Sequence, residues 1–439
     1  MSHCIPLNPI QYKFWMDDLL KYPTSEYNDT NYVFVVEGNL SVPTLKEAYR
    51  LLSLEYLPLC STIQIKDGNP YFVSNIELLK VNDIYVTSVE EVNDIIMRLA
   101  EQPFDLKKEA PSRFYIIHLD NRFFLFHLFH HVVMDGLSLR TFFNRLSTIY
   151  NQLLDGNYIA IDQMKMLDEY NQLFEVQYHK NRLQNVGYWR NYMKGVPLRL
   201  PVPHTPLECS SIQQKEYAYT FDLGAERNFK IQSFCRSQKT TCFRLFSSVW
   251  AFTLSRILRV DNLLLDHTLN MRSKEYDSLF GVFVNNLPVK YLFQAEKTFA
   301  DILIDVNESR VNERIHSAVF YSDILQYLYE NGDIDKRESI NIGINYPIEY
   351  RALTLYLTGC NVNPYKHVNV NLSADLVLAI EDNDIFTCEI RYRSTISLNF
   401  IRVLSEVFCE ILDQVILFPH IKLKNIRLIS FDLQKKILE

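Results

Sequence analysis

Glycine is scarce in this chain, since only 11 of the 439 residues are glycine. This excludes a collagen-like repeat and glycine-rich linkers, and it makes the position of each glycine informative. No apolar run approaches the roughly 18 residues that a membrane-spanning helix needs. The N-terminus, MSHCIPLNPIQYKF, has no basic segment followed by an apolar one, as a secretory signal would. We therefore expect a soluble, cytoplasmic protein.

The chain also lacks an excess of positive charge. Lysine and arginine number 45 against 52 aspartates and glutamates, which gives a net charge of −7. Without a basic field, sequence-independent binding of nucleic acid is not expected. The eight cysteines contain no CxxC pair. We interpret them as buried, reduced thiols rather than as a zinc site or a disulfide framework.

The composition of the chain, with 48% apolar and 22% charged residues, is typical of a globular protein. Its length suggests two or three folding units, or one large bilobal one. Strand-like and helix-like patterns alternate throughout, which favours an α+β fold. The segment GVPLRLPVPHTP at 195–206 contains four prolines and is the best candidate for a linker, placed at about residues 195–213.

Periodicity predicts individual elements. Strands are expected at Tyr32–Glu37, Phe114–Leu119, Phe123–Phe129, Glu216–Phe221, Leu263–Thr268, Ile340–Ile344, Val368–Leu372, Leu376–Ile380 and Phe386–Tyr392. Helices are expected at Val42–Leu57, Ser138–Leu154, Ala225–Arg236, Thr241–Arg256, Phe299–Glu313 and Leu398–Leu417, with one or two more within Asp162–Met193. Ser41 is the expected cap of the first of these helices.

The most distinctive segment is HHVVMDG at 130–136, between the Phe123–Phe129 strand and the Ser138–Leu154 helix. Strand ends are common sites for reacting side chains. Adjacent residues at a strand end point to opposite sides, so we expect one of His130 and His131 to face the core and the other a cavity. Gly136 permits a backbone turn or a close approach of substrate.

The residue types alone leave several interpretations open. The segment could be a buried histidine pair with Asp135 capping the next helix. A metal site is weaker, because HHxxxD is a loose set of ligands with no second cluster. A Ser-His-Asp triad has no G-x-S-x-G segment to support it. The remaining interpretation is a lone imidazole acting as general base or orienting group, with a carboxylate in a structural electrostatic role.

HHVVMDG resembles the HHxxxDG signature of condensation domains of nonribosomal peptide synthetases, in the chloramphenicol-acetyltransferase-like superfamily. Other segments that resemble the family follow in its order over about residues 5–433. They are Pro6–Gln11 with Phe14-Trp15, Phe104-Asp105-Leu106 with Ala110-Pro111 and Arg113, Tyr188-Trp189 with Leu200-Pro201, Thr241-Cys242-Phe243, Gly281–Pro288 (GVFVNNLP) and Tyr392-Arg393-Ser394.

The chain departs from the family pattern at two segments. The family's RHExLRTxF appears only as Glu55–Ile63 (EYLPLCSTI), without either arginine, and HQDYPFE appears as His316–Ser322 (HSAVFYS). These departures put the usual geometry of partner binding in doubt. Segments typical of the cyclising and epimerising subfamilies are absent from the sequence.

The resemblance implies an α+β fold of two chloramphenicol-acetyltransferase-like lobes, arranged as a V-shaped pseudo-dimer with the active site in a tunnel between them. The lobe that carries HHxxxDG would span residues 1–180, and the second lobe residues 181–439. The initiating Met favours a free-standing chain over an excised domain, and we expect a monomer. The sequence contains neither an adenylation segment nor a carrier-protein serine motif, so the donor would arrive on a separate carrier protein.

The resemblance also implies roles for residues. His131 would be the active-site imidazole, and Gly136 would lie where the thioester approaches. His130 would be packed and structural, and Asp135 would form an ion pair with Arg272, although Arg272 could instead be an exposed surface arginine. Asn285 and Asn345 are possible tunnel-lining residues, but for Asn345 a structural place at a strand end is equally compatible.

The implied reaction joins a carrier-bound acyl or aminoacyl thioester to an amine, which is either carrier-bound or free. No metal is required, and no cofactor is bound directly, because the donor arrives on the 4'-phosphopantetheine of a carrier protein. Lys180, Arg182, Arg190 and Lys194 are candidates for a basic docking site, although a solvated helix face is the simpler interpretation. The alternatives are an ester-forming acyltransferase of the same fold and a non-catalytic module that recruits a partner enzyme.

Overall fold

The computed structural model describes residues 4–21, 30–204, 216–335, 338–346, 353–366, 374–382 and 385–429. The chain divides into two compact units. The first unit comprises Met1–Val176, Asn270–Val284 and Glu349–Asn371, and the second comprises Gln177–Leu269, Asn285–Ile348 and Leu372–Glu439. Two segments from later in the sequence therefore belong to the first unit, and one of them contains Arg272.

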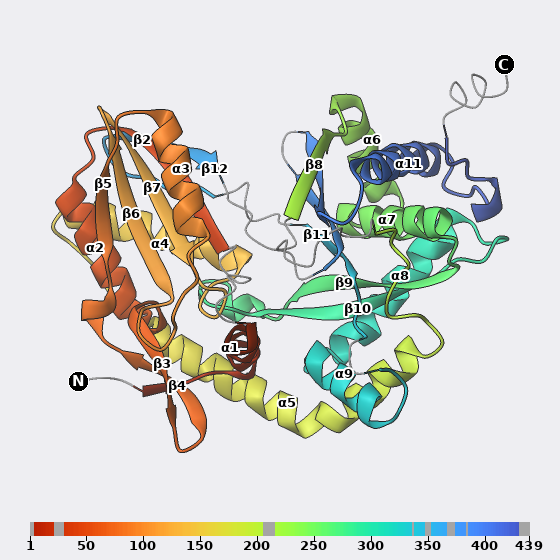
Figure 1. The fold of residues 1–439 in the computed structure, drawn as a ribbon, viewed down its shortest axis with the longest axis horizontal. Coiled ribbons are helices and arrows are strands. Elements are labelled where there is room, and N and C mark those ends of the chain that lie inside the picture. The colour runs from red at the N-terminus through yellow and green to blue at the C-terminus, as the bar shows by residue number, and fades with distance from the viewer. Residues whose placement is uncertain are drawn as a thin grey trace. The chain divides into compact units, whose positions relative to one another are not determined.

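The first unit contains a five-stranded sheet with the strand order β12-β2-β7-β6-β5 (Figure 1). In that order the strands are β12 (Cys360–Lys366), β2 (Thr30–Gly38), β7 (Arg122–Phe129), β6 (Ser112–Leu119) and β5 (Val81–Tyr85). Neighbours are antiparallel except for β5 and β6, which run parallel. A smaller sheet has the order β1-β4-β3. Its strands are β1 (Cys4–Pro6), β4 (Asn69–Ser74) and β3 (Ser61–Lys66).

Strand β7, which leads into the HHVVMDG segment, lies in the middle of the larger sheet and pairs with both β2 and β6. Residues 124–129 of β7 are all buried, as expected for a strand covered on both faces. Leu119 pairs with Arg122, so the β6–β7 turn consists of Asp120 and Asn121. Asp120 has a φ of 50°, and both of the common two-residue hairpin turns, types I′ and II′, require a positive φ at their first position. The sequence Asp120-Asn121-Arg122 suits a hairpin turn, and the hairpin is confirmed, although Arg122 belongs to β7 and not to the turn.

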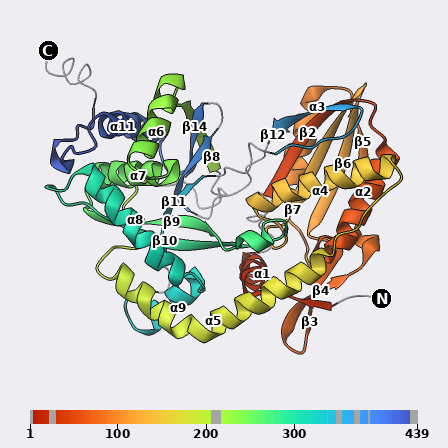
Figure 2. The same cartoon turned by 180° about the vertical axis from the view of Figure 1, so that it is seen from behind.

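Helices cover both faces of this sheet. Helices α2 (Val42–Glu55) and α4 (Gly136–Leu154) pack side by side on one face, and α3 (Val89–Ala100) lies on the other (Figures 1 and 2). Ser41 caps α2 as predicted, because its side chain accepts a hydrogen bond from the Thr44 N–H. The apolar residues of α4 that periodicity assigned to one side are buried: Leu139, Phe142, Phe143, Leu146, Ile149 and Tyr150.

The second unit contains a six-stranded sheet with the order β10-β9-β11-β13-β14-β8. In that order the strands are β10 (Val284–Leu292), β9 (Asn262–Asn270), β11 (Ile342–Asn345), β13 (Leu376–Asp382), β14 (Phe386–Arg393) and β8 (Glu216–Asp222). Helices α6 (Ala225–Ser237), α7 (Cys242–Leu258) and α11 (Leu398–Leu417) pack together, and α8 (Phe299–Ile315) contacts α7. Leu263 and Leu265 join one apolar core and Leu264 another, because successive residues of a strand face opposite sides.

The mixed α+β class predicted from the sequence is confirmed, and so is the helix at Leu398–Leu417, with the same bounds. The 162–193 region is one helix, α5 (Gln163–Met193), rather than two. Helices α1 (Pro9–Lys21), α3 and α9 (Tyr321–Glu330) were not predicted. The strand expected at Val368–Leu372 lies outside the described residues. Among the helices that are described, none is both long enough and apolar enough to cross a bilayer.

Candidate active site

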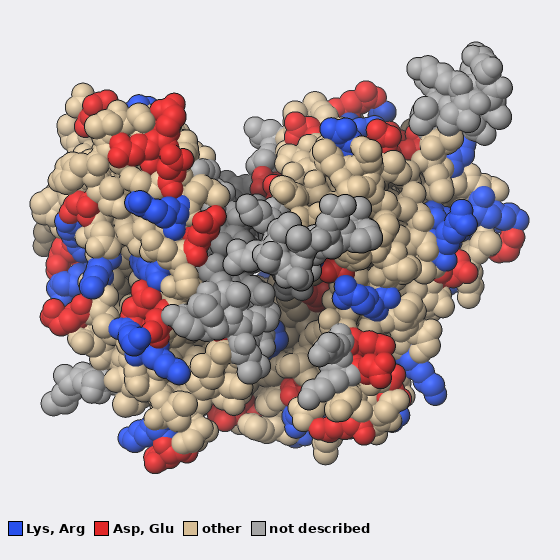
Figure 3. Space-filling model, viewed as in Figure 1, with Lys and Arg blue, Asp and Glu red and all other residues tan. Residues whose placement is uncertain are grey.

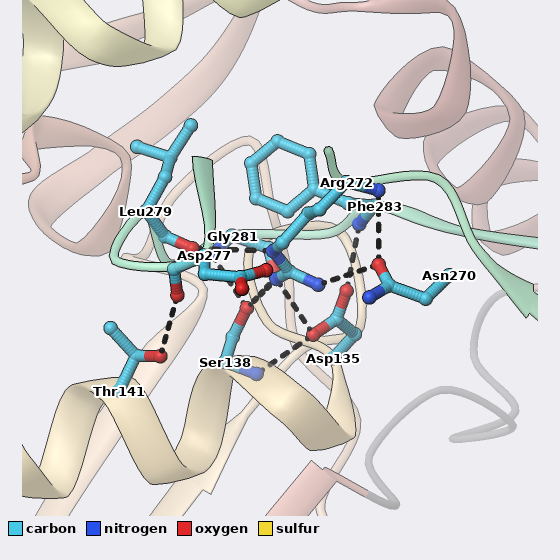
Figure 4. A network of polar contacts seen from close by, with 9 residues as sticks. All are labelled: Asp135, Ser138, Thr141, Asn270, Arg272, Asp277, Leu279, Gly281 and Phe283. Atoms are coloured by element: carbon cyan, nitrogen blue, oxygen red, sulfur yellow. Dashed lines mark hydrogen bonds and ion pairs between the residues drawn. The ribbon is translucent and has the colours of Figure 1, made fainter. Parts of the chain in front are cut away.

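A buried ion pair joins the start of α4 to the Asn270–Val284 segment (Figure 4). Nη2 of Arg272 lies 3.0 Å from Oδ1 of Asp135, and their side chains are 0% and 1% exposed. Both residues belong to the first unit. A buried charge is tolerated only when it is paired, so each side chain depends on the other. The structure brings together two residues that are 137 positions apart in the sequence.

Asp135 also caps α4. Its Oδ1 accepts a hydrogen bond from the Ser138 N–H at 2.9 Å, and its Oδ2 accepts one from the Phe283 N–H at 2.8 Å. Burial by itself would raise the pKa of Asp135, but the charge of Arg272 and these hydrogen bonds outweigh it and hold the pKa below its ordinary value. The carboxylate is therefore ionised, and both of its oxygens are already occupied by structural partners.

Ser138 holds the same segment through the backbone of Gly281. Its Oγ donates to the Gly281 carbonyl at 2.7 Å and accepts from the Gly281 N–H at 2.9 Å. Nη2 of Arg272 also donates to this hydroxyl. Gly281 has a φ of 152°, and a Cβ at this position would lie only 2.7 Å from Oη of Tyr56. The close approach of Tyr56 to this backbone therefore requires glycine here.

The remaining contacts of Arg272 are with other residues of the Asn270–Val284 segment. Nε donates to the Leu279 carbonyl at 3.3 Å, and Nη1 donates to Oδ1 of Asn270 at 3.3 Å. The guanidinium carbon lies 4.2 Å from the ring centroid of Phe283. Arginine, with its fork of donors, can satisfy all these partners at once, whereas lysine could not.

His130 is completely buried and has a defined tautomer. Its Nδ1 accepts a hydrogen bond from the Val132 N–H at 3.0 Å, so this nitrogen carries no proton. The proton of the neutral ring is on Nε2, which lies 3.2 Å from Oδ1 of Asp18. The ring of Phe104 contacts the imidazole edge to face, with centroids 5.9 Å apart. His130 therefore stabilises the turn that follows β7.

His131 lies in a different environment. The residue is only partly buried, and its ring stacks on Phe14, with centroids 4.4 Å apart and an interplanar angle of 10°. Nδ1 of His131 is buried and has no hydrogen-bond partner among the described residues. The two adjacent histidines thus differ in burial, as expected for neighbours at a strand end.

The other residues that we singled out from the sequence lie as follows. Gly136 is half-buried and is the first residue of α4. Asn285 is 5% exposed, and its side-chain amide donates to the carbonyls of Ser317 and Val319. Asn345 is half-buried and is the last residue of β11. Both asparagines belong to the second unit, whereas the histidines belong to the first.

Two of the four basic residues considered for docking are paired with acids. Arg182 lies 2.9 Å from Asp323, and Arg190 lies 2.6 Å from Asp333. Lys180 and Lys194 are exposed. On the face drawn in Figure 3, positive and negative side chains are interspersed. These observations favour a solvated helix face over a basic docking site.

No metal centre appears in the part of the chain that the structure describes, because nowhere there do three histidine, cysteine, aspartate or glutamate side chains come close enough to hold an ion. His130 and Asp135 belong to the HHxxxD segment that was considered as a loose set of metal ligands, and each of them interacts with another partner.

Several residues at this site were not identified from the sequence as site residues: Asp18, Ser138, Gly281 and Phe283. The resemblance drew attention to Phe14 and Gly281 but assigned them no contact. Ser138 was visible only as the start of a predicted helix. An aspartate is typical of an N-cap, so the start of the helix has a signal in the sequence, but the bonds of the Ser138 hydroxyl to a distant glycine have none.

The chain has the chloramphenicol-acetyltransferase-like fold of solved condensation domains. The first condensation domain of the calcium-dependent antibiotic synthetase is similar, with a TM-score of 0.75 and 17% identity over 98% of this chain and 99% of that one. The X-domain from teicoplanin biosynthesis is also similar, with a TM-score of 0.82 and 18% identity over 97% and 98% of the two chains.

The family model for the condensation domain matches residues 1–438, and the chain therefore belongs to that family. Its relatives include tyrocidine synthase 3 of Brevibacillus parabrevis, 21% identical over 76% of this chain and 5% of the relative. A plipastatin synthase of Bacillus subtilis (strain 168) is 23% identical over 100% of this chain and 17% of the relative. The chain thus spans a small part of these peptide synthetases. Condensation domains are acyltransferases that form amide bonds and work with carrier proteins bearing phosphopantetheine.

Proposed function

We propose that this chain is an amide-forming acyltransferase, which joins an acyl or aminoacyl thioester on a carrier protein to an amine. The observation that carries the proposal is the arrangement of the HHxxxDG segment. His130 and Asp135 are buried and bonded to structural partners, whereas His131 is partly exposed. A segment that served packing alone would have no reason to leave an imidazole accessible beside such a rigid turn.

His131 is the proposed catalytic residue. Nδ1 is turned into the protein, so Nε2 is the nitrogen that meets the substrate. In the neutral ring, an unprotonated Nε2 accepts a hydrogen bond from the attacking amine and takes its proton as the N–C bond forms. The tetrahedral intermediate then expels the pantetheine sulfur, which takes this proton from Nε2 of His131 and leaves as a thiol, so that the imidazole is neutral again. The thioester is already activated, so the step needs neither a nucleotide nor a metal.

Asp135 does not act on His131 in this mechanism. Its two oxygens accept from Arg272, Ser138 and Phe283, and the buried Nδ1 of His131 makes no hydrogen bond among the described residues, so Asp135 does not orient the imidazole as in a Ser-His-Asp triad. We propose instead that the ion pair makes the turn rigid and so keeps His131 and Gly136 in place. Positioning of two reactants can lower a barrier by about 7–11 kcal/mol, so a rigid frame is a sufficient contribution.

The proposed partner is a carrier protein, whose 4'-phosphopantetheine delivers the donor, and no cofactor is held by the chain itself. Gly136 has no side chain and is only half-buried, so we propose that the thioester approaches the protein beside it. The acceptor amine is either free or borne by a second carrier.

The proposal is tested by incubating the chain with an acylated carrier protein and a panel of amines, and measuring amide products by mass spectrometry. We expect His131→Ala to lose about 10²–10⁴-fold in rate, the usual contribution of a general base. The exposed His179 provides a matched control, and His179→Gln should retain the wild-type rate. A His131→Ala variant that turns over as fast as wild type would exclude the assignment.

The same assay separates the two alternatives. An ester-forming acyltransferase would give product with alcohols and none with amines. A recruitment module would bind the acylated carrier without turnover of any acceptor. The second alternative is of interest because the X-domain from teicoplanin biosynthesis has been solved in a complex with a second protein, OxyB. This chain is similar in fold to that structure, with a TM-score of 0.81. The accessible His131 favours the catalytic function.

A further inference from the structure

Two residues of helix α1, one turn apart, contact the two histidines of the HHxxxDG segment. Phe14 stacks on His131, and Asp18 lies 3.2 Å from His130. Residues four apart project from the same face of a helix, so one face of α1 contacts both imidazoles. A single rigid helix therefore holds both histidines of the HHxxxDG segment.

The N-terminus of α1 is itself held firmly. The Asn8 side chain accepts from the Gln11 N–H at 2.8 Å, and the Gln11 side chain accepts from the Asn8 N–H at 3.0 Å. This reciprocal pair is a capping box. Nδ2 of Asn8 also donates to Oδ1 of Asn171 on α5 at 3.1 Å. The rotation of α1, and with it the position of Phe14, is therefore constrained at its start.

The stacking contact matters because His131 lacks the usual means of orientation. A reactive imidazole is commonly oriented by a hydrogen bond from one ring nitrogen to a carboxylate or carbonyl. Nδ1 of His131 has no such partner among the described residues, and the oxygens of Asp135 are occupied. The parallel ring of Phe14 is the contact that defines the plane of the imidazole.

We infer that Phe14 is a positioning residue for His131, which holds the imidazole in the plane that directs Nε2 toward the reacting amine. The inference rests on the proposed function and adds to it a residue that does not touch the substrate. Stacking fixes the plane of a ring without fixing its tautomer, so either nitrogen of His131 remains free to carry the proton. Nε2 can therefore accept a proton and release it without breaking a hydrogen bond at Nδ1.

The kinetic test compares Phe14→Leu with Phe14→Tyr in the acyl-carrier assay. Leucine keeps an apolar side chain but removes the ring, and we expect kcat to fall 10- to 100-fold with KM for the amine unchanged. Tyrosine restores a ring that can stack, and Phe14→Tyr should keep kcat within about threefold of wild type. The control is Tyr12→Leu, because Tyr12 is on the same helix but is 46% exposed. It should behave as wild type.

The structural test is independent of activity. The imidazole protons of His131, assigned by their absence in His131→Ala, should appear upfield in NMR spectra because they lie over an aromatic ring. They should move downfield in Phe14→Leu and stay in place in Tyr12→Leu. Thermal unfolding is recorded for every variant, and Phe14→Met replaces the leucine variant if that one does not fold.

The outcomes are distinguishable. If the wild-type chain is active and Phe14→Leu is equally fast, or if the His131 protons do not move, the inference is wrong and the proposed function stands. If the wild-type chain joins no thioester to any amine, the proposed function fails, whatever the NMR result. A parallel loss of kcat and stability in both Phe14→Leu and Phe14→Tyr would reduce Phe14 to a packing residue and also overturn the inference.

Discussion

Oη of Tyr49 and Nε2 of His127 lie 2.6 Å apart, completely buried in the first unit. His127 is on β7, and its Nδ1 lies 3.4 Å from the carbonyl of Tyr32, so the neutral ring donates there and accepts from Tyr49. Burial lowers the pKa of His127 to about 3 and raises the pKa of Tyr49. The strand that leads into the HHxxxDG segment thus contains a histidine that remains neutral.

This pair predicts a loss of stability in mild acid. An unfolded histidine takes up a proton near pH 6.5, whereas folded His127 does so only near pH 3. Between these values the unfolded state binds more protons, so stability falls as the pH falls, by up to about 1.4 kcal/mol per pH unit. In urea titrations between pH 6.5 and pH 4.5, His127→Gln should reduce this slope. The exposed His179→Gln should not change it, and equal slopes for wild type and His127→Gln would contradict the prediction.

The buried pair of Asp135 and Arg272 predicts a strong effect on stability. Removing one partner leaves the other as an uncompensated buried charge, so Asp135→Asn and Arg272→Met should each lower the free energy of unfolding by about 3–5 kcal/mol. The double variant Asp135→Asn/Arg272→Met should lose less than the sum of the two. Urea denaturation measures all three. Additive losses would show that the two side chains do not interact in solution.

A surface pair is the control for that cycle. Lys297 and Asp305 lie 2.6 Å apart, with side chains 34% and 48% exposed. Ion pairs of this kind contribute about 0.2–1 kcal/mol. Lys297→Met and Asp305→Asn should therefore change the free energy of unfolding by less than about 1 kcal/mol each.

Substituting Gly281 tests how closely Tyr56 approaches the backbone of the Asn270–Val284 segment. An added Cβ would lie 2.7 Å from Oη of Tyr56 and 2.8 Å from the Phe283 ring. Gly281→Ala should destabilise the protein by about 1–3 kcal/mol from overpacking, in addition to the backbone strain. Gly68 also has positive φ but has no atom within 4 Å of an added Cβ, so Gly68→Ala isolates the backbone term. Thermal unfolding should show the larger loss for Gly281→Ala, and equal losses would argue against the close contact.

Much of the local structure near the site could be predicted from the residues. The apolar run of β7, the presence of a turn before it and the helical periodicity after Ser138 each depend on neighbours in the sequence. Strand β10 was not predicted, although the resemblance marked part of it as a motif. Helix α1 was also missed, because PIQYKFWMDDLLK has only a weak apolar face.

The contacts between residues that are far apart in the sequence could not be predicted in this way. Periodicity and spacing could not connect Asp135 with Arg272, and the pairing was expected only from the resemblance to condensation domains. The contacts of Ser138 with Gly281, of Asp18 with His130 and of Phe14 with His131 were not expected at all.

By itself the sequence determined the short-range features of this protein: a buried strand ending in two histidines, an aspartate able to cap the next helix, and a family signature around them. These depend on hydrogen bonds and side-chain spacing within a few residues. Only the tertiary structure decided which histidine stays accessible and what neutralises the aspartate. The reason is that Arg272, Gly281 and Phe14 reach the site through the path of the whole chain, and burial, which sets the strength of their contacts, exists only after folding.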